Sequence, residues 1–134
     1  MSHDQGMRQP QSVGKDARAL IHSALVGEAL EHGPIAVFVF DEEGRYLTVN
    51  RFACELLGFE RDELLRRCVG ELSALPQDVA IETYQRAVKT GAESTTAVLH
   101  ADGSIVHLRF RASATRVAGM PVFVGVAWPV PREL

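Results

Sequence analysis

The chain has 134 residues, 46% of them hydrophobic and 23% charged, and a formal net charge of −3. This length and composition predict one globular domain with its own core, and the charge argues against a binder of nucleic acid or anionic lipid. The two cysteines, Cys54 and Cys68, are too few for a disulfide framework. There is no membrane-spanning apolar run of roughly 20 residues and no signal-peptide core, so we expect a reduced, cytoplasmic protein.

The N-terminal region divides into two parts. Residues 1–15 are rich in Gln, Gly and Ser and are expected to form a disordered tail. A helix is predicted over residues 16–32, with Asp16 as a suitable cap and Gly33-Pro34 as its end. Its apolar residues recur at helical spacing and form one stripe, which comprises Ala17, Leu20, Ile21, Ala24 and Leu25.

Two strands and a sharp corner follow. Residues 35–40 are apolar at every position, which is typical of a strand covered on both faces. After the turn-forming residues 41–44, a second strand is predicted over residues 46–49. Asn50 can then cap the next helix through its side-chain oxygen, and Gly58 can end that helix in the left-handed conformation.

Two more helices are predicted further along the chain. In residues 60–67, acidic side chains come first and arginines last, in agreement with the helix dipole. Asp78 is a suitable cap for a longer helix over residues 79–90, and Gly91 ends it.

Beyond Gly91 the hydrophobic period changes to two, which predicts strands over residues 94–101, 104–115 and 122–128. Asp102-Gly103 is a strong signal for a two-residue hairpin turn. With this turn the predicted cross-strand pairs are Leu99 with Val106, Ala97 with Leu108, and Thr95 with Phe110. The opposite face would then carry Val98, His100, His107, Arg109 and Arg111.

The order of elements implies an α+β fold. We expect a five-stranded antiparallel sheet with the short helices of residues 50–90 on one face. The N-terminal amphipathic helix is the only predicted helix left for the other face.

Four segments, in the same order as in a known family, make the region from about Gly33 to Trp128 similar to a PAS domain. They are the strand pair IAVFVFD and GRYLTVN, the helices FACELLGF and DELL, the helix start PQD, and the hairpin turn ADGS. The resemblance implies a PAS domain over residues 33–130, in which the sheet cups a small cavity under the short helices.

The resemblance also implies a function. PAS domains are generally sensors or interaction modules that bind a cofactor, a metabolite or nothing, and pass a change to a partner protein or to flanking helices. No phosphate-binding loop, zinc-protease helix or nucleophile elbow is present in the sequence. We therefore expect a non-catalytic sensory or protein-interaction domain. The alternative is a small α+β enzyme or a carrier of hydrophobic ligands, and the enzyme would need a carboxylate or a histidine inside the cavity.

The sequence does not favour haem, flavin or a metal. Haem-binding relatives use a histidine on the long helix, and residues 79–90 contain none. Cys68 lies one residue before the place of the reactive cysteine in flavin-binding relatives and lacks their flanking residues, so it is interpreted as a small buried apolar side chain. His100 and His107 are too few for a tetrahedral zinc site. The cofactor, if there is one, stays unassigned.

The candidate pocket consists of mostly apolar residues expected to face inward. They are Phe40, Phe52, Leu56, Leu65, Cys68, Leu72, Tyr84, Val88, Leu108, Phe110 and Val124. Phe38 joins them if the first strand turns that side to the cavity, since Phe38 and Phe40 face either the cavity or the N-terminal helix. A ligand would be small and largely apolar, with Asn50, Tyr84 or Thr95 for polar contacts. The alternative is a filled core.

The C-terminal end is not suited to a signalling helix, which leaves the N-terminal helix as the candidate for contacts with a partner. Many bacterial relatives continue their last strand into a signalling helix, but Pro129 and Pro131 disfavour a helix here. We expect no kinase, cyclase or DNA-binding output on the chain, which is either a stand-alone domain or a piece of a larger protein. Its partners are then a signalling protein or itself. A homodimer is predicted, with Leu20, Ile21, Ala24, Leu25 and Trp128 near the interface.

Overall fold

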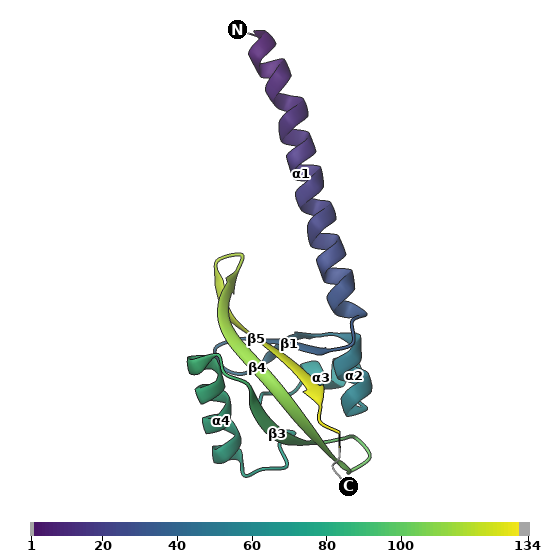
Figure 1. The fold of residues 1–134 in the computed structure, drawn as a ribbon, viewed down its shortest axis with the longest axis vertical. Coiled ribbons are helices and arrows are strands. Elements are labelled where there is room, and N and C mark those ends of the chain that lie inside the picture. The colour runs from purple at the N-terminus through teal and green to yellow at the C-terminus, as the bar shows by residue number, and fades with distance from the viewer. Residues whose placement is uncertain (1, 132–134) are drawn as a thin grey trace.

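The computed structural model describes the backbone of residues 2–131 and the side chains of residues 14 and 16–131. The helices and strands follow one another as shown in Figure 1. In chain order they are α1 (Ser2–Glu31), β1 (Ala36–Phe40), β2 (Tyr46–Val49), α2 (Arg51–Leu57), α3 (Arg61–Leu65), α4 (Gln77–Thr90), β3 (Ser94–Leu99), β4 (Ile105–Val117) and β5 (Met120–Pro129). None of the helices in the described part is long and apolar enough to span a membrane.

The strands form one antiparallel sheet in the order β2-β1-β5-β4-β3. One face, called the inner face here, contacts α2 through β1, α3 through β2 and α4 through β4. The opposite, outer face carries the alternate residues of each strand, such as Val39 and Val124, which pair across β1 and β5. The predicted α+β fold with a five-stranded antiparallel sheet is confirmed.

The first helix differs from the prediction in two ways. It begins at Ser2 instead of Asp16, so the backbone of residues 2–15, predicted to be a disordered tail, is helical. Helix formation is cooperative, and a formed helix extends through residues of weak preference. Moreover, α1 does not cover the outer face but extends away from the sheet (Figure 1). Its side chains Leu20, Ile21 and Leu25 are 72%, 59% and 63% exposed.

Asn50 forms the corner between β2 and α2. Its side chain is 5% exposed, and its Oδ1 accepts hydrogen bonds from the backbone N–H of Val37 at 2.9 Å and of Ala53 at 3.1 Å. Its Nδ2 donates to the backbone carbonyls of Leu30 and Ile35. The bond from Ala53 confirms the predicted helix cap. All four hydrogen-bonding positions of the carboxamide are filled, and one side chain joins the end of α1, β1 and α2.

The hairpin of β3 and β4 has a register one residue away from the prediction. Thr96 pairs with Leu108, and Val98 pairs with Val106. The N–H of His100 donates to the carbonyl of Ser104 at 2.8 Å, so the loop between them has three residues rather than two. Gly103, with φ of 88°, supplies the left-handed residue that such a loop needs.

The observed register reverses the faces predicted for the β3 side chains and leaves those of β4 as predicted. Because pairing determines the face, the inner face receives Thr96 and Val98, while Thr95, Ala97 and Leu99 lie on the outer face. The predictions for Thr95 and for Val98 were therefore wrong. Leu108 and Phe110 are buried, whereas His107, Arg109 and Arg111 are exposed, in agreement with the predicted faces of β4.

The corner at Asn50 gives a testable prediction for stability. Asn50→Asp keeps the oxygen acceptor for α2 but removes both N–H donors, so the carbonyls of Leu30 and Ile35 lose their partner. We expect the free energy of unfolding at pH 7, measured by urea titration, to fall by about 3 kcal/mol. A buried carboxyl beside two carbonyls has a raised pKa and can still donate when protonated. The loss should therefore shrink as the pH falls through that raised pKa.

The matched control is Gln85→Glu, which makes the same carboxamide-to-carboxylate change at an exposed position of α4. It should alter the unfolding free energy by less than about 0.5 kcal/mol. Equal losses in the two variants would contradict the role of Asn50 as a buried junction.

Candidate functional site

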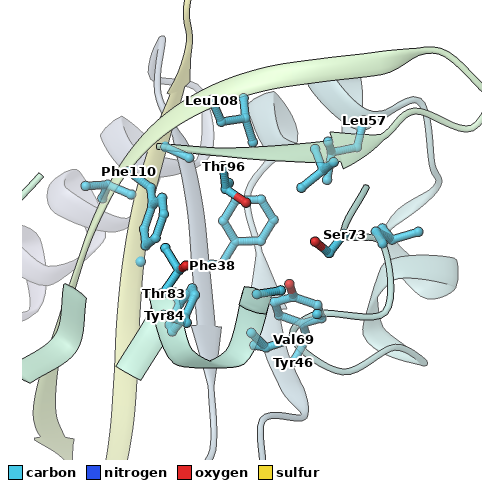
Figure 2. Close-up of a pocket in the computed structure, with 17 residues that line it drawn as sticks. Phe38, Tyr46, Leu57, Val69, Ser73, Thr83, Tyr84, Thr96, Leu108 and Phe110 are labelled. Atoms are coloured by element: carbon cyan, nitrogen blue, oxygen red, sulfur yellow. The ribbon is translucent and has the colours of Figure 1, made fainter. Parts of the chain in front are cut away.

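A cavity of about 90 Å³ lies between the inner face and α4 (Figure 2). All five strands, α2, α4 and the segment before α4 contribute to its wall. The lining residues are Phe38, Tyr46, Leu57, Val69, Gly70, Leu72, Ser73, Ala80, Thr83, Tyr84, Thr96, Val98, Leu108, Phe110, Gly125, Val126 and Ala127.

Residues 67–74, called the crossing segment here, form one wall of the cavity and run from one edge of the sheet to the other. At the β2 edge, the N–H of Tyr46 donates to the carbonyl of Arg67, and the N–H of Val69 donates to the carbonyl of Gly44. At the β3 edge, the N–H of Leu99 donates to the carbonyl of Leu72 at 2.7 Å. The segment therefore covers both edge strands as well as the cavity, and protects those edges from pairing with other chains.

Only part of the predicted pocket lies at this cavity. Leu72, Tyr84, Leu108 and Phe110 line it. Phe38, whose direction the sequence left open, lines it as well. The other predicted positions lie outside the lining, and they are Phe40, Phe52, Leu56, Leu65, Cys68, Val88 and Val124.

The positions outside the lining have identifiable places. Phe40 is on the inner face but beyond the cavity, stacked against Phe123 with ring centroids 5.4 Å apart. Phe52 and Leu56 pack against the buried core instead. Val124 is on the outer face, because side chains alternate along a strand and the neighbouring Gly125 faces inward.

Cys68 and the two histidines lie apart from the cavity. Cys68 forms a β-bridge with Arg45, and burial, followed by the nearby Glu71 carboxylate, raises the pKa of its thiol. His100 is not on the outer face with His107 but contacts α2, where a methyl on Gly58 would lie 2.4 Å from the imidazole. The described residues contain no group of three or more side chains that could hold a metal ion.

Several lining residues were missed by sequence reasoning. Thr96 was missed because the hairpin register was wrong by one residue. Gly125 carried a usable signal, since a glycine inside a strand often marks the close approach of another group. A side-chain Cβ at Gly125 would lie 2.6 Å from the hydroxyl of Tyr84, so the glycine lets this hydroxyl reach the sheet.

Aromatic rings hold Tyr84 in place. Its ring stacks on Phe110 with centroids 5.3 Å apart and an interplanar angle of 13°, and it meets the edge of Phe40 at 5.0 Å. Burial raises the pKa of Tyr84, and burial, with smaller contributions from Cys68 and Glu71, raises the pKa of Tyr46 to about 12. Both phenols are therefore protonated near neutral pH and available as hydrogen-bond donors.

The residues predicted at a dimer interface occupy two surfaces. Ala24 is exposed on α1, as are Leu20, Ile21 and Leu25. Trp128 is half-buried on the outer face, where it pairs with Arg109. The arginines beside it already have partners, because Arg109 pairs with Glu93 at 3.3 Å and Arg111 donates to the carbonyl of Gly91.

Comparison with known proteins agrees with this geometry. A family model described as the PAS fold matches residues 30–127. The PAS domain of an HTR-like protein from Haloarcula marismortui superimposes with a TM-score of 0.73 at 19% identity, covering 87% of this chain and 98% of that one. A PAS domain from a two-component sensor histidine kinase gives a TM-score of 0.71 at 12% identity, covering 84% and 99%.

A third solved structure has a higher identity. It is a domain of the sensory box sensor histidine kinase/response regulator from Geobacter sulfurreducens, with 25% identity, a TM-score of 0.66 and coverage of 81% of this chain and 95% of that one. No curated protein sequence matches the chain.

The contact between Tyr84 and Gly125 gives a prediction that a double-mutant cycle can test. Gly125→Ala places a methyl 2.6 Å from the Tyr84 hydroxyl, and we expect it to lower the free energy of unfolding by about 2 kcal/mol. Tyr84→Phe removes the colliding oxygen, and the ring carbon that carried it is 3.9 Å from the Cβ position. In the double variant most of the loss should therefore be recovered. Additive losses would contradict this contact.

Proposed function

This chain belongs to the PAS fold family, and on that premise we propose that it is a cytoplasmic, non-catalytic sensory domain. It binds a small ligand or a partner protein and acts as a homodimer through α1. The observation that carries the proposal is a partly open cavity whose walls connect, through Asn50, to a helix with an exposed apolar stripe. The names of similar solved structures, which include sensor histidine kinases, support a sensory role.

The route from cavity to helix has few steps. Phe38 on β1 and Leu57 on α2 both line the cavity. Asn50 binds the N–H of Val37, which precedes Phe38, and the N–H of Ala53 in the first turn of α2. A ligand that moves β1 relative to α2 therefore changes the geometry around the Asn50 carboxamide. The same carboxamide holds the last turn of α1, so the change reaches that helix.

The apolar stripe of α1 supports dimerisation. Three of its side chains are more than half exposed, and α1 extends away from its own sheet (Figure 1). A second copy of the chain offers the same stripe, so a two-fold arrangement buries both stripes in one self-complementary contact. Trp128 on the outer face is the proposed second part of the interface.

An enzymatic function has less support from the cavity. Among the lining residues that the structure describes, none is a carboxylate, an imidazole or an amine. The tyrosines there have raised pKa values, which makes them poor bases near neutral pH. A carrier of small apolar molecules would use the same cavity, but it would have no use for an exposed helix joined to the cavity wall.

The ligand part of the proposal can be tested on the protein as purified from cells. We expect native mass spectrometry to show an added mass on the order of 100 Da, the size of one ring, that is absent after denaturation. The absorption spectrum should show only aromatic side chains. Bands from haem or flavin would contradict the proposed cavity size, and an unmodified mass would favour the interaction branch of the proposal.

The dimer part can be tested with Leu25→Glu. A carboxylate in a buried apolar contact costs several kcal/mol, so we expect the dissociation constant from analytical ultracentrifugation to rise by at least about 30-fold. The control is Ala19→Glu, which adds the same charge at an exposed position on the side of α1 away from the stripe and should leave the constant unchanged. A wild-type protein that sediments as a monomer at high micromolar concentration would refute the proposed dimer.

A further inference from the structure

The size of the cavity limits what it can hold. At about 90 Å³ it is well below the roughly 300–1,000 Å³ of pockets for drug-sized ligands. It is closer to the roughly 150 Å³ of an engineered apolar cavity that binds benzene. A molecule larger than one ring would require the crossing segment or α4 to move outward.

The walls of the cavity are aromatic but not purely apolar. Four rings line it, and one pair of them, Phe38 and Tyr46, has centroids 5.7 Å apart at a tilt of 42°. Five hydroxyl side chains also line it, and they are Tyr46, Ser73, Thr83, Tyr84 and Thr96. Figure 2 shows Phe38, Tyr46, Ser73 and Thr96 converging from different segments of the chain.

Four of these hydroxyls lack a protein partner. In the described part of the chain, Ser73 is the one lining hydroxyl with a hydrogen bond to another residue, and those of Tyr46, Thr83, Tyr84 and Thr96 have none. Ser73, in contrast, already accepts a hydrogen bond from the N–H of Leu75 at 3.0 Å. The buried side-chain polar atom without a partner in the described residues is Arg67 Nε, so the unpartnered hydroxyls are accessible from the cavity and can bind a polar atom of a ligand there.

The same wall excludes a charged ligand. None of the described lining residues is charged, so an ionised carboxylate or ammonium in the cavity would lose its hydration without gaining a counter-charge. Burial of such a charge costs several kcal/mol. Neutral hydroxyls can orient a neutral oxygen of the ligand without that cost.

From these observations we infer that the cavity selects an uncharged molecule of about one ring that carries a hydroxyl or carbonyl oxygen. Phenol is the simplest example. This inference rests on the proposed function, since it assumes that the cavity is a ligand site. It adds the class of ligand, with Thr96 as a residue that determines specificity by hydrogen bonding to the polar atom.

Three probes of similar ring size test the inference on the full chain by NMR titration, namely phenol, benzene and benzoate. At pH 7 we expect phenol to bind at least about 30-fold more tightly than benzoate, because benzoate brings an unpaired charge into the cavity. Phenol should also bind about 10-fold more tightly than benzene, which cannot use the hydroxyls.

A matched pair of variants on β3 then tests the hydroxyl. Thr96→Val removes the inward hydroxyl with little change in shape, and should weaken phenol binding by about 5–10-fold while leaving benzene binding unchanged. Thr95→Val makes the same change on the outer face and should affect neither probe. The thermal midpoint of each variant checks that the fold is retained.

The outcomes distinguish an error in the inferred class of ligand from the absence of a ligand site. Benzoate binding as tight as that of phenol, or equal affinities for phenol and benzene, would overturn the inferred class and leave the cavity as a ligand site. If no probe shifts the resonances of lining residues at millimolar concentration, the ligand branch of the proposed function fails with it. The dimer proposed through α1 is tested separately, by the ultracentrifugation of the Leu25→Glu variant.

Discussion

Two carbonyl oxygens and two backbone N–H groups from three elements converge on the carboxamide of Asn50. The N–H groups belong to β1 and α2, and the carbonyls belong to the end of α1 and the linker after it. A serine or an aspartate would cap α2 but lacks the two donors that the carbonyls require. An alanine would leave four backbone groups without this partner at a position that water scarcely reaches. The path of the chain from sheet edge to sheet face, and the place where α1 leaves the domain, therefore depend on one side chain.

The cavity depends on the sheet in a comparable way. A larger residue at Gly125 would push Tyr84 away from the strand, and the ring of Tyr84 is in turn held between Phe40 and Phe110. The cavity next to these rings costs stability relative to a core filled with side chains, because its lining has fewer dispersion contacts within the protein. The crossing segment contributes Val69 and Leu72 to the cavity wall, and backbone hydrogen bonds attach it to both sheet edges. The cavity wall is thus made from the same elements that complete the sheet.

The sequence predicted features that depend on local chemistry and missed features that depend on register. Asn50 and Gly58 were identified because capping oxygens and left-handed glycines act within a single turn of helix. The β3–β4 pairing was wrong by one residue, because Asp102-Gly103 also fits a three-residue loop and no side-chain pattern on β3 excluded that register. The error reversed the face of every β3 residue, so Thr96 was missed. Val124 was assigned to the wrong face because β5 is apolar on both faces, so its sequence pattern does not indicate which side chains point inward.

Two contacts that attach the end of α1 to the domain, one through Glu31 and one through Asn50, are not equivalent. Glu31 pairs with Arg61, whose Nε also donates to the carbonyl of Val49 at 3.2 Å, but both charged side chains are substantially exposed. Exposed ion pairs are typically worth about 0–1 kcal/mol and weaken with salt. The Asn50 carboxamide is buried, so water does not replace its hydrogen bonds when they lengthen. A coupling free energy between distant sites is typically about 1–3 kcal/mol. One or two buried hydrogen bonds can supply a free energy of this size, whereas an exposed ion pair such as Glu31–Arg61 is mostly too weak to do so. In the proposed route, a change at the cavity reaches α1 mainly through Asn50, and the orientation of the helix should depend little on ionic strength.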